Sequence, residues 1–536
     1  MRLYNNIEIV EDGFPPDTID FRSAKVIEAP YLKKKPDFID ISVGRQLFVD
    51  DFLIAFTDLQ RTEYRPIPHA GNPVFSPETP WEKGECTHYA ERARPAASIL
   101  FSGGMWYDGK RKKYRMWYQA GFHGGIAYAE SDDGLHFVRE KFTVYGDTNL
   151  VLPRGGVWFD TNSVILNHYP ENAEKAEHVM SLYVRPSGVE RTGLFVFSSA
   201  DGIHWTLQTL TGSKGYTDLN GCDDTSNISY NPFRKKWIYS MKHILPPAGR
   251  VRFYAEGDTL TAARDTDRKV FWLRADEADR KEPAYGCMPQ LYSFNTIAYE
   301  SIMLGAYDIW KGPENDVCMA AGNPKITEIH LGFSRDGFHY VRQKDRSPFI
   351  GCSRDKKRWD NGYVHASDTI CLIDGDELRF YYSAFRGDEI MRGGTEETNG
   401  MYAGGAVGIA KLRRDGFASL DGTGIIVTEK LKSDGKYLFI NASAEMVCAE
   451  ITDEEGDPIR GFERENCRVF SGDGCKENIA WVGKRDLSEL YGRPFRIKFY
   501  LKNGKLYAFW LSKKQTGESG GYLAGGEVGK ETLRDD

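Results

Sequence analysis

The chain has 536 residues, more than one hydrophobic core of ordinary size can organise, so we expect two units, or one large repetitive unit with a smaller one. Its 29 Tyr, 30 Phe, 11 Trp and 55 Gly are typical of aromatic strands joined by tight turns, which indicates a β protein. A net charge of -7 without a basic tract gives no attraction for phosphate backbones or anionic lipid, so we expect neither nucleic acid nor membrane as a partner.

The N-terminus and the cysteines indicate the compartment. Residues 1–8 lack the apolar segment of a secretory signal, and no apolar stretch reaches the length that spans a membrane, so we expect a cytoplasmic protein. The 9 cysteines include no CxxC pair, and an odd number cannot all pair internally. We therefore expect reduced thiols, no metal and no cofactor. The sequence leaves the oligomeric state open, a homo-oligomer included.

A short motif recurs along the chain. Residues 131–137, 199–205 and 334–340 all read Ser-x-Asp-Gly, then an apolar residue, His and an aromatic residue. An Asp-Gly turn between apolar strands predicts a β-hairpin, because Gly adopts positive φ freely and Asp can bond its own backbone. Asp133 and Asp201 are 68 residues apart, whereas Asp201 and Asp336 are 135 apart, about twice that period. We place a degenerate copy at residues 252–258 and a further copy at 412–417.

These repeats predict a propeller. A period of this length with several strands per unit is typical of propeller blades. In the first unit we expect strands at 96–101, 114–119, 126–130 and 136–139, and the segment 47–54 is expected to close the ring against the last blade. After about residue 425, short strands with tight turns indicate a β-sandwich, whose polar end from Lys513 onward is expected to be frayed.

The predicted fold is therefore all-β: a five-bladed β-propeller followed by a C-terminal β-sandwich. The predicted boundaries are an N-terminal extension at 1–40, the propeller with the catalytic site at 41–425, and the sandwich at 426–536.

Acidic residues at the starts of predicted inner strands are candidates for catalysis, because these starts meet at one face of the central channel. Two carboxyl groups placed there can act as proton donor and as base or nucleophile if one is protonated and the other ionised. Our preferred pair is Asp160 and Asp224, which open inner strands in consecutive units, with Glu91 as third choice. For each of them, capping of a turn is the alternative. The turn aspartates at 133, 201, 336 and 415 are expected to be structural.

Other polar residues at the same face are candidates for substrate binding. They are Arg94, His123, Lys242, Gln290, Asp360 and His365. The alternative for Arg94 is a buried side chain that binds strand-end carbonyls, and for both histidines it is a hydrogen-bonded place in the core. No HExxH, phosphate-binding Gly loop or GxSxG motif is present in the sequence.

Several segments together resemble a known family. Arg94-Pro95 with residues 103–108 (GGMWYD), 230–233 (YNPF) and 331–339 (LGFSRDGFH) resemble the furanosidase-type glycoside hydrolases, notably family 32-like bacterial proteins, over residues 45 to 512. The resemblance implies the architecture and sugar chemistry. The characterised enzymes carry Asn-Asp-Pro, Arg-Asp-Pro and Glu-Cys motifs in successive blades, and none is intact in its place here, so no catalytic role is carried over.

Three functions remain open. The first is an exo-acting glycoside hydrolase for a furanoside (fructofuranoside- or arabinofuranoside-like) or a short oligosaccharide. The second is a phosphorylase or transglycosylase that uses the same pocket. The third is a non-catalytic carbohydrate-binding propeller. In each, the expected partner is a small carbohydrate.

Overall fold

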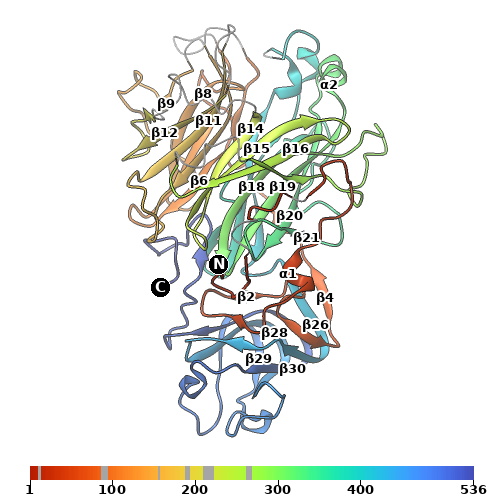
Figure 1. Cartoon of the computed structure of the whole chain (residues 1–536). Helices are drawn as coiled ribbons and strands as arrows, with labels where there is room; N and C mark the ends of the chain where they lie inside the picture. Colours follow the sequence, from red (N-terminus) through yellow and green to blue (C-terminus); the bar gives the residue numbers. More distant parts are fainter. Residues whose placement is uncertain are drawn as a thin grey trace.

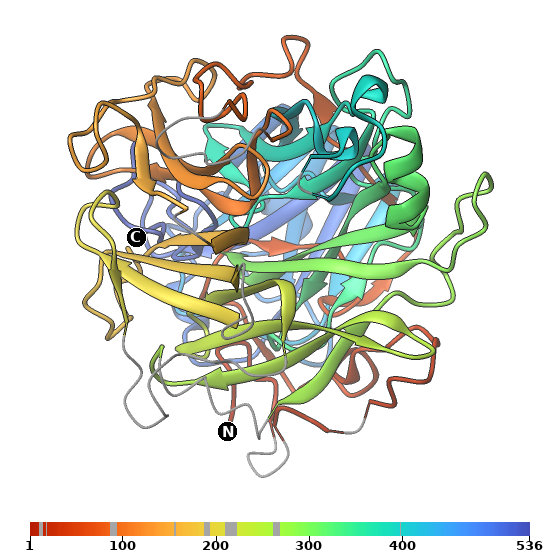
Figure 2. The same ribbon diagram turned by 90° about the horizontal axis from the view of Figure 1, so that it is seen from above.

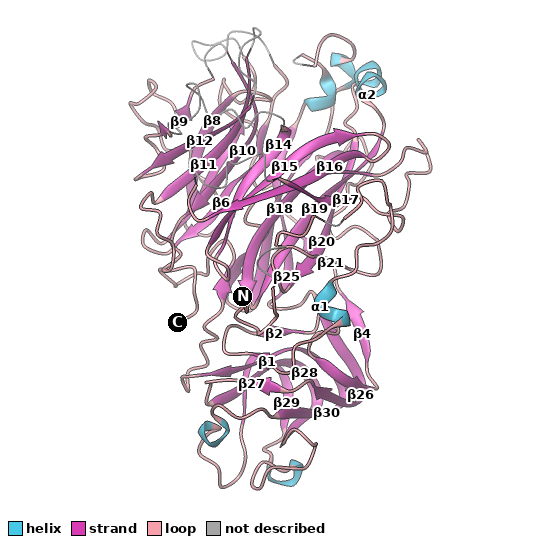
Figure 3. Ribbon diagram, viewed as in Figure 1, coloured by secondary structure: helices cyan, strands magenta, loops and turns pink. Residues whose placement is uncertain are grey.

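The structure is a computed structural model, and it describes residues 1–9, 14–17, 19–85, 94–154, 157–186, 193–208, 222–260, 269–396 and 398–536. With 48% strand and 5% helix it is nearly all β, which confirms the predicted class. Figures 1 and 3 show antiparallel sheets in the upper part of the molecule and a separate sheet, built mainly from C-terminal strands, below them. None of the helices in the described part of the chain is long and apolar enough to cross a membrane.

The first sheets in chain order share one hydrogen-bonded path. One half contains β6 (Ser98–Asp108), β7 (Lys113–Ala120), β8 (Gly125–Ser131) and β9 (Leu150–Leu152). The other contains β10 (Val157–Leu166), β11 (His178–Pro186), β12 (Gly193–Ser199) and β13 (Thr206–Leu207). The halves meet where Asn162 of β10 lies beside Ser102 of β6.

Three further sheets repeat this antiparallel order within the described residues. One is β14 (Asp223–Asn231), β15 (Lys236–Leu245), β16 (Gly249–Gly257) and β17 (Val270–Arg274). The next is β18 (Gln290–Glu300), β19 (Ile302–Gly312), β20 (Ile326–Ser334) and β21 (Val341–Arg342). The last has β22 (Gly362–Ala366), β24 (Glu377–Phe385), β25 (Gly405–Arg413) and β5 (Ile67–Pro68), with β23 (Leu372–Asp374) on β24. Seen from above, the sheets follow one another around a common centre in chain order (Figure 2).

The lower sheet combines strands from both ends of the chain. It contains β29 (Phe470–Ile479), β28 (Tyr437–Thr452), β30 (Arg496–Ser512) and β26 (Ala418–Thr428), joined by β2 (Gln46–Leu47), β3 (Ile54–Thr57) and β4 (Gln60–Glu63). β1 (Ile39–Asp40) pairs in parallel with β27 (Leu431–Lys432). The short helices are α1 (Pro30–Lys33), α2 (Asn315–Ala321), η4 (Glu389–Met391), η5 (Gly400–Tyr402), η6 (Arg464–Asn466) and η7 (Ser488–Leu490).

Strand pairing differs from the prediction for segment 47–54. It does not close the ring: β2 and β3 pair with β30 and β26 of the lower sheet, while β5 pairs with β25. Apolar side chains drive this choice, since Phe48, Phe52 and Leu53 are buried in the lower core. The division of the chain at 40 and 425 stays a prediction.

Two further local predictions were wrong. Residues 136–139 contribute only an isolated bridge between Glu130 and Val138, and the outer strand of the first sheet is β9. The end beyond Lys513 is not frayed, because β31 (Tyr522–Leu523) pairs with β18. Tyr522, Leu523, Ala524 and Leu533 are buried in the core, and this apolar burial holds an otherwise polar tail in place.

The repeated Ser-x-Asp-Gly motif forms a turn directly after β8, β12 and β20, as predicted. In the first copy, Ser131 Oγ accepts from Gly134 N at 2.9 Å, and Asp133 Oδ1 accepts from the Leu135 and His136 amides at 2.8 and 2.9 Å. Asp201 and Asp336 make the same bonds in their copies. These aspartates are therefore structural.

Each turn is also held by the sheet that precedes it around the ring. Tyr381 Oη donates to Gly134 O at 2.8 Å, Trp117 Nε1 to Gly202 O at 2.7 Å and Trp272 Nε1 to Phe338 O at 2.8 Å. At the last copy, Tyr299 Oη donates to Asp415 Oδ1 at 2.6 Å. The motif thus stabilises the turn and joins neighbouring sheets.

Candidate active site

A cavity of about 220 Å³ lies where the inner strands β10, β14 and β18 begin. Asn315, the first residue of α2, lines it, and α2 lies at the end of the molecule opposite the lower sheet (Figure 1). The charged lining residues are Asp160, Arg185, Asp223, Asp224, Lys242, Arg250, Lys325 and Glu396. The aromatic lining residues are Phe122, His123, Tyr292, Tyr363 and Tyr402.

A β-bulge at the start of each inner strand presents these side chains. The register shifts between Phe159 and Asn162 in β10, between Asp223 and Asn227 in β14 and between Leu291 and Ser293 in β18. A bulge redirects side chains and is over-represented next to active sites. Asp160, Asp224 and Tyr292 all lie within these bulges and face one cavity.

A buried arginine fixes the bulge of β14. Arg252 Nη1 and Nη2 donate to Thr225 O and Oγ1, both at 2.8 Å, and Nη2 also donates to Tyr292 O at 2.5 Å. Thr225 has a φ of 60°, a left-handed conformation that a β-branched residue rarely adopts. Arg252 therefore supports the strained backbone directly behind Asp224.

Arg185 of β11 joins the two preferred carboxylates. Its Nε lies 2.8 Å from Asp160 Oδ2, and its Nη2 donates a hydrogen bond to Asp224 Oδ2. Since Nε and Nη2 belong to one guanidinium, the two carboxylates are close neighbours at its edge. The cation also lets two negative groups share a small cavity.

Asp224 is held in its ionised form. Lys242 Nζ donates to Asp224 Oδ1 and lies 3.3 Å from Asp223 Oδ2. Burial alone would favour the neutral acid, but the Lys242 ammonium and Arg185 hold the pKa of Asp224 well below its usual value. Asp224 can therefore act as a nucleophile or base at neutral pH, and it is unsuited to donate a proton.

Two more cations of the cavity, Arg250 and Lys325, lie against aromatic rings. Arg250 stacks 5.3 Å from the Tyr292 ring and 4.9 Å from Trp310. Lys325 lies 5.1 Å from Tyr292 and 4.8 Å from Tyr363. Burial lowers the pKa of Lys325 to about 8, and the nearby charge of Arg250 acts in the same direction. Neither Arg250 nor Lys325 has an acidic partner within 4.0 Å among the described residues.

More aromatic side chains lie next to Tyr363, whose ring centroid is 5.8 Å from that of Tyr402. Phe122 and Tyr402 stack with ring centroids 3.8 Å apart, and His123 stacks with Trp158 at 5.5 Å. His123 Nε2 lies 3.8 Å from Asp160 Oδ1. Flat apolar faces with a polar edge are suited to packing against a sugar ring.

The structure brings together some of the predicted site residues. Asp160, Asp224, His123 and Lys242 all line the cavity. Gln290 stands just behind it, where its Oε1 accepts from Arg250 Nη1 at 2.8 Å.

The remaining predicted residues lie elsewhere. Arg94 is buried and donates to His123 O at 2.7 Å, so it supports the loop that carries His123. His365 is buried with its Nδ1 3.0 Å from Asp308 Oδ2. Asp360 accepts two bonds from Arg358 and lines a different cavity. Glu91 lies outside the described residues.

Sequence reasoning missed Arg250, Lys325 and Glu396. Arg250 is the second residue of β16 and Lys325 directly precedes β20, so both lie where a third strand begins. Glu396 lies in the long connection from β24 to β25. All three lie in or beside a connection from a second to a third strand, so their place along the sheet indicates the segment but not which of its residues face the cavity.

Among the described residues, no group of three His, Cys, Asp or Glu converges to hold a metal ion. The described cysteines are free thiols, and Cys86 lies outside the described residues.

No family model and no curated protein matches the chain. Solved structures do, and they are glycoside hydrolases of propeller-type families. One of them comes from the GH130 family of mannoside phosphorylases, which is described as containing glycoside hydrolases that target β-1,2 mannosidic linkages in Candida mannan. Its sequence is 15% identical, the match covers 67% of this chain and 96% of that chain, and the TM-score is 0.40.

Two other neighbours are similar at the same level. A GH32 β-fructofuranosidase of Bombyx mori is 10% identical, covers 78% of this chain and 93% of its own, and has a TM-score of 0.37. A thermostable family-43 glycoside hydrolase is 13% identical, covers 60% and 93%, and has a TM-score of 0.36.

Proposed function

We propose that the protein is a glycoside-cleaving enzyme whose active site is the cavity around Arg185. In this proposal the sheets of the upper part are the five blades of a β-propeller, and the lower sheet is the core of a C-terminal β-sandwich. The observation that carries the proposal is the pair Asp160 and Asp224 held on one guanidinium at the bulged starts of adjacent inner strands. Buried carboxylates are costly without a role, and perturbed groups in a cleft are candidates for catalysis.

The ionised Asp224 is the proposed nucleophile, or the base that activates water. A proton donor must be a carboxyl group that can hold its proton until the leaving oxygen needs it. Asp160 is the first candidate for the donor, because it lies beside Asp224 on the same guanidinium. Glu396 is the second candidate: it lines the cavity, accepts from Asn315 Nδ2 at 2.8 Å, and has no cation within 4.0 Å among the described residues.

The size of the cavity supports exo action. About 220 Å³ is below the range of about 300–1,000 Å³ typical of sites for drug-sized ligands. The cavity suits one sugar ring at the end of a short oligosaccharide. A furanoside is the proposed class of substrate.

A second candidate function is phosphorolysis. Arg250 and Lys325 face the cavity without an acidic partner within 4.0 Å among the described residues, so an anion such as phosphate could lie beside them. Phosphate would then replace water as the acceptor of the sugar.

Turnover of a panel of aryl furanosides and pyranosides, with and without inorganic phosphate, tests both functions. Hydrolysis without phosphate supports the first function, and strict dependence on phosphate supports the second. No turnover of any glycoside under either condition would favour a non-catalytic sugar-binding protein.

Variants assign the roles on whichever aryl glycoside turns over. Asp224→Asn is expected to lower kcat by about 10⁴-fold or more for every leaving group, because the attacking or activating group is lost. The proton-donor variant, Asp160→Asn or Glu396→Gln, is expected to lower the rate for alkyl glycosides yet keep most activity on dinitrophenyl glycosides, which need no proton. Full activity in both Asp160→Asn and Asp224→Asn would show that the cavity is not the active site.

A further inference from the structure

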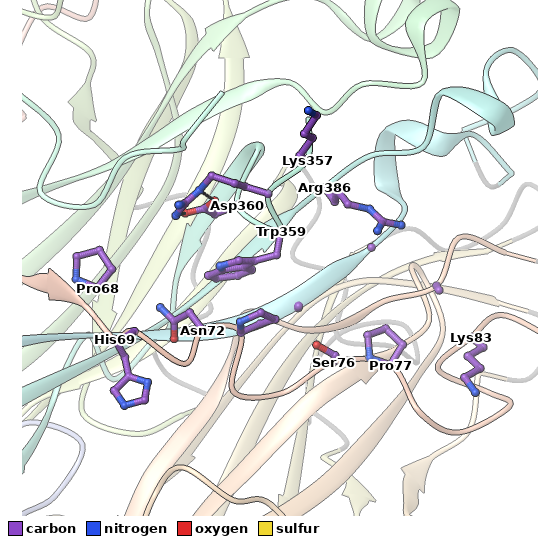
Figure 4. A pocket seen from close by; sticks show the side chains of 16 residues that line it. Pro68, His69, Asn72, Ser76, Pro77, Lys83, Lys357, Trp359, Asp360 and Arg386 are labelled. Atoms are coloured by element: carbon purple, nitrogen blue, oxygen red, sulfur yellow. Dashed lines mark hydrogen bonds and ion pairs between the residues drawn. The ribbon is translucent and has the colours of Figure 1, made fainter. Parts of the chain in front are cut away.

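A second and larger cavity lies beside the catalytic candidate. Its volume is about 920 Å³, and it lies between the segment 68–83 and the start of β22. Figure 4 shows Trp359 in its middle, between Asn72 and Arg386. The two cavities have no lining residue in common, so this one is not an extension of the cavity around Arg185.

The cavity has an excess of positive charge. Lys83, Lys357 and Arg386 line it, and none of them has an acidic partner within 4.0 Å among the described residues. Arg358 is neutralised, because its Nε and Nη2 donate to the two oxygens of Asp360 at 2.9 and 3.1 Å. Lys357 and Arg386 are exposed and free to approach an anion. In a protein with a net charge of -7, this concentration of cations is local.

Trp359 provides an apolar surface at the centre of the cations. Its ring packs 5.4 Å from Tyr382, and a side chain on Gly408 would come within 2.5 Å of the indole, so only glycine leaves it room. The half-buried indole is therefore held in place while part of it lines the cavity. Pro68, Pro73 and Pro77 give the opposite side a rigid apolar lining.

We propose that this cavity binds an acidic oligosaccharide, a chain of sugar rings that carry carboxylate or sulfate groups. The rings would pack on Trp359 and the prolines, and the anionic groups would bind Lys357, Arg386 and Lys83. A volume of about 920 Å³ accommodates several sugar rings, unlike the small catalytic candidate. The proposal concerns binding, so it stands or falls independently of the proposed catalysis.

Isothermal titration calorimetry on the full chain tests the proposal. The probes are an oligogalacturonide, a sulfated heparin-derived oligosaccharide and a neutral cello-oligosaccharide of the same length. We expect binding of at least one acidic probe, weakened by added salt because the contacts are exposed ion pairs, and no comparable binding of the neutral probe. Preference between the acidic probes identifies the anionic group.

Charge reversals localise the site. Lys357→Glu and Arg386→Glu are each expected to weaken binding of the acidic probe by about tenfold or more. The control is Lys112→Glu, an exposed lysine in the turn between β6 and β7, at the opposite end of β6 from the cavity; it is expected to bind like the unmodified protein. Turnover of a small aryl glycoside should not change in any of the three variants.

Two results would overturn the proposal. One is no binding of either acidic probe at millimolar concentration, and the other is equal affinity of the unmodified protein and both reversal variants. Melting temperatures of the variants show that the comparison concerns folded proteins. Loss of aryl glycoside turnover in Asp224→Asn with unchanged binding of the acidic probe would confirm that the two sites are separate.

Discussion

At the scale of residues, the candidate site is a compact set of alternating charges. Asp160, Asp223 and Asp224 face Arg185 and Lys242, and each carboxylate has a cation within 3.3 Å. An unpaired charge in such a place would cost several kcal/mol, roughly, whereas paired charges are tolerated. The cations thus allow a small cavity to hold the acids that glycoside cleavage needs.

Lys325 gives the site a predicted response to pH. Burial lowers its pKa to about 8, so the ammonium loses its charge in the folded protein as the pH rises through that value. If its charge stabilises the bound anion or the transition state, kcat/KM falls above a pH of about 8. Lys325→Arg keeps the positive charge to higher pH, so in this variant the fall in kcat/KM is expected at a higher pH.

The measurement is the pH profile of kcat/KM for the unmodified enzyme and for Lys325→Arg on one aryl glycoside. The charged groups that face Lys325 are Arg250, Lys242 and Asp224, and the other titratable groups near it are Cys318, Tyr292, Tyr363 and Tyr402. If kcat/KM falls at the same alkaline pH in both proteins, the group that titrates is not Lys325.

The sequence predicts only part of this site. Position at a strand start was enough to single out Asp160 and Asp224, because every inner strand begins at the same face. Lys325 and Glu396 come from connections of irregular length, and no periodicity marks which of their residues reach the cavity. His365 was predicted to line the site, but it lies against Asp308. The register of β22 shifts between Gly362 and His365, and a strand-start rule cannot predict such a shift or the side chains that it redirects.

At the scale of elements, the Asp-Gly turn is a unit that the sequence predicts well. The hydrogen bonds within the turn are local, so seven residues specify them, while the bonds from neighbouring sheets depend on the fold. The outer strands were not predictable in the same way. β9 and β13 are only 3 and 2 residues long, and each is a strand because it pairs with one neighbouring strand, β8 or β12.

Substitution of two glycines tests how closely the Asp-Gly turn packs against the neighbouring sheet. Gly202 has a φ of 81°, and a Cβ there would lie 2.5 Å from Trp117 of the preceding sheet. Gly375 has a φ of 60°, but a Cβ there would meet no atom within 4 Å. Gly375→Ala should therefore cost about 1–2 kcal/mol from the backbone alone.

Gly202→Ala should cost more, about 3 kcal/mol or above, since the overlap with Trp117 adds to the backbone strain. Thermal unfolding of the two variants beside the unmodified protein gives the comparison. Equal losses in melting temperature would mean that the turn does not transmit strain to the neighbouring sheet.

At the scale of the whole molecule, segments near both ends of the chain pair with strands that lie far away in sequence. β2, β3 and β4 complete the lower sheet, and the tail after residue 519 pairs with β18 and buries Leu523. The repeat period predicts how many similar sheets to expect, because neighbouring strands are local. It does not predict these partners, since several edges could accept a short apolar segment and only packing selects among them.

The ring of sheets gives the candidate site its geometry. Asp160, Asp224, Tyr292 and Lys325 span more than 160 residues of sequence, and the bulged strand starts bring them to one cavity. Segment 68–83 and the residues before β22 build a second cavity with a different charge. In our two proposals, one scaffold carries a small site for cleavage and a wider site that binds an acidic chain.

The crystal structure of Asp224→Asn with the glycoside that the unmodified enzyme turns over tests the central claim most directly. Our account predicts a sugar ring in the cavity of about 220 Å³, with its glycosidic bond beside residues 160 and 224. A sugar bound elsewhere, with this cavity empty, would contradict it.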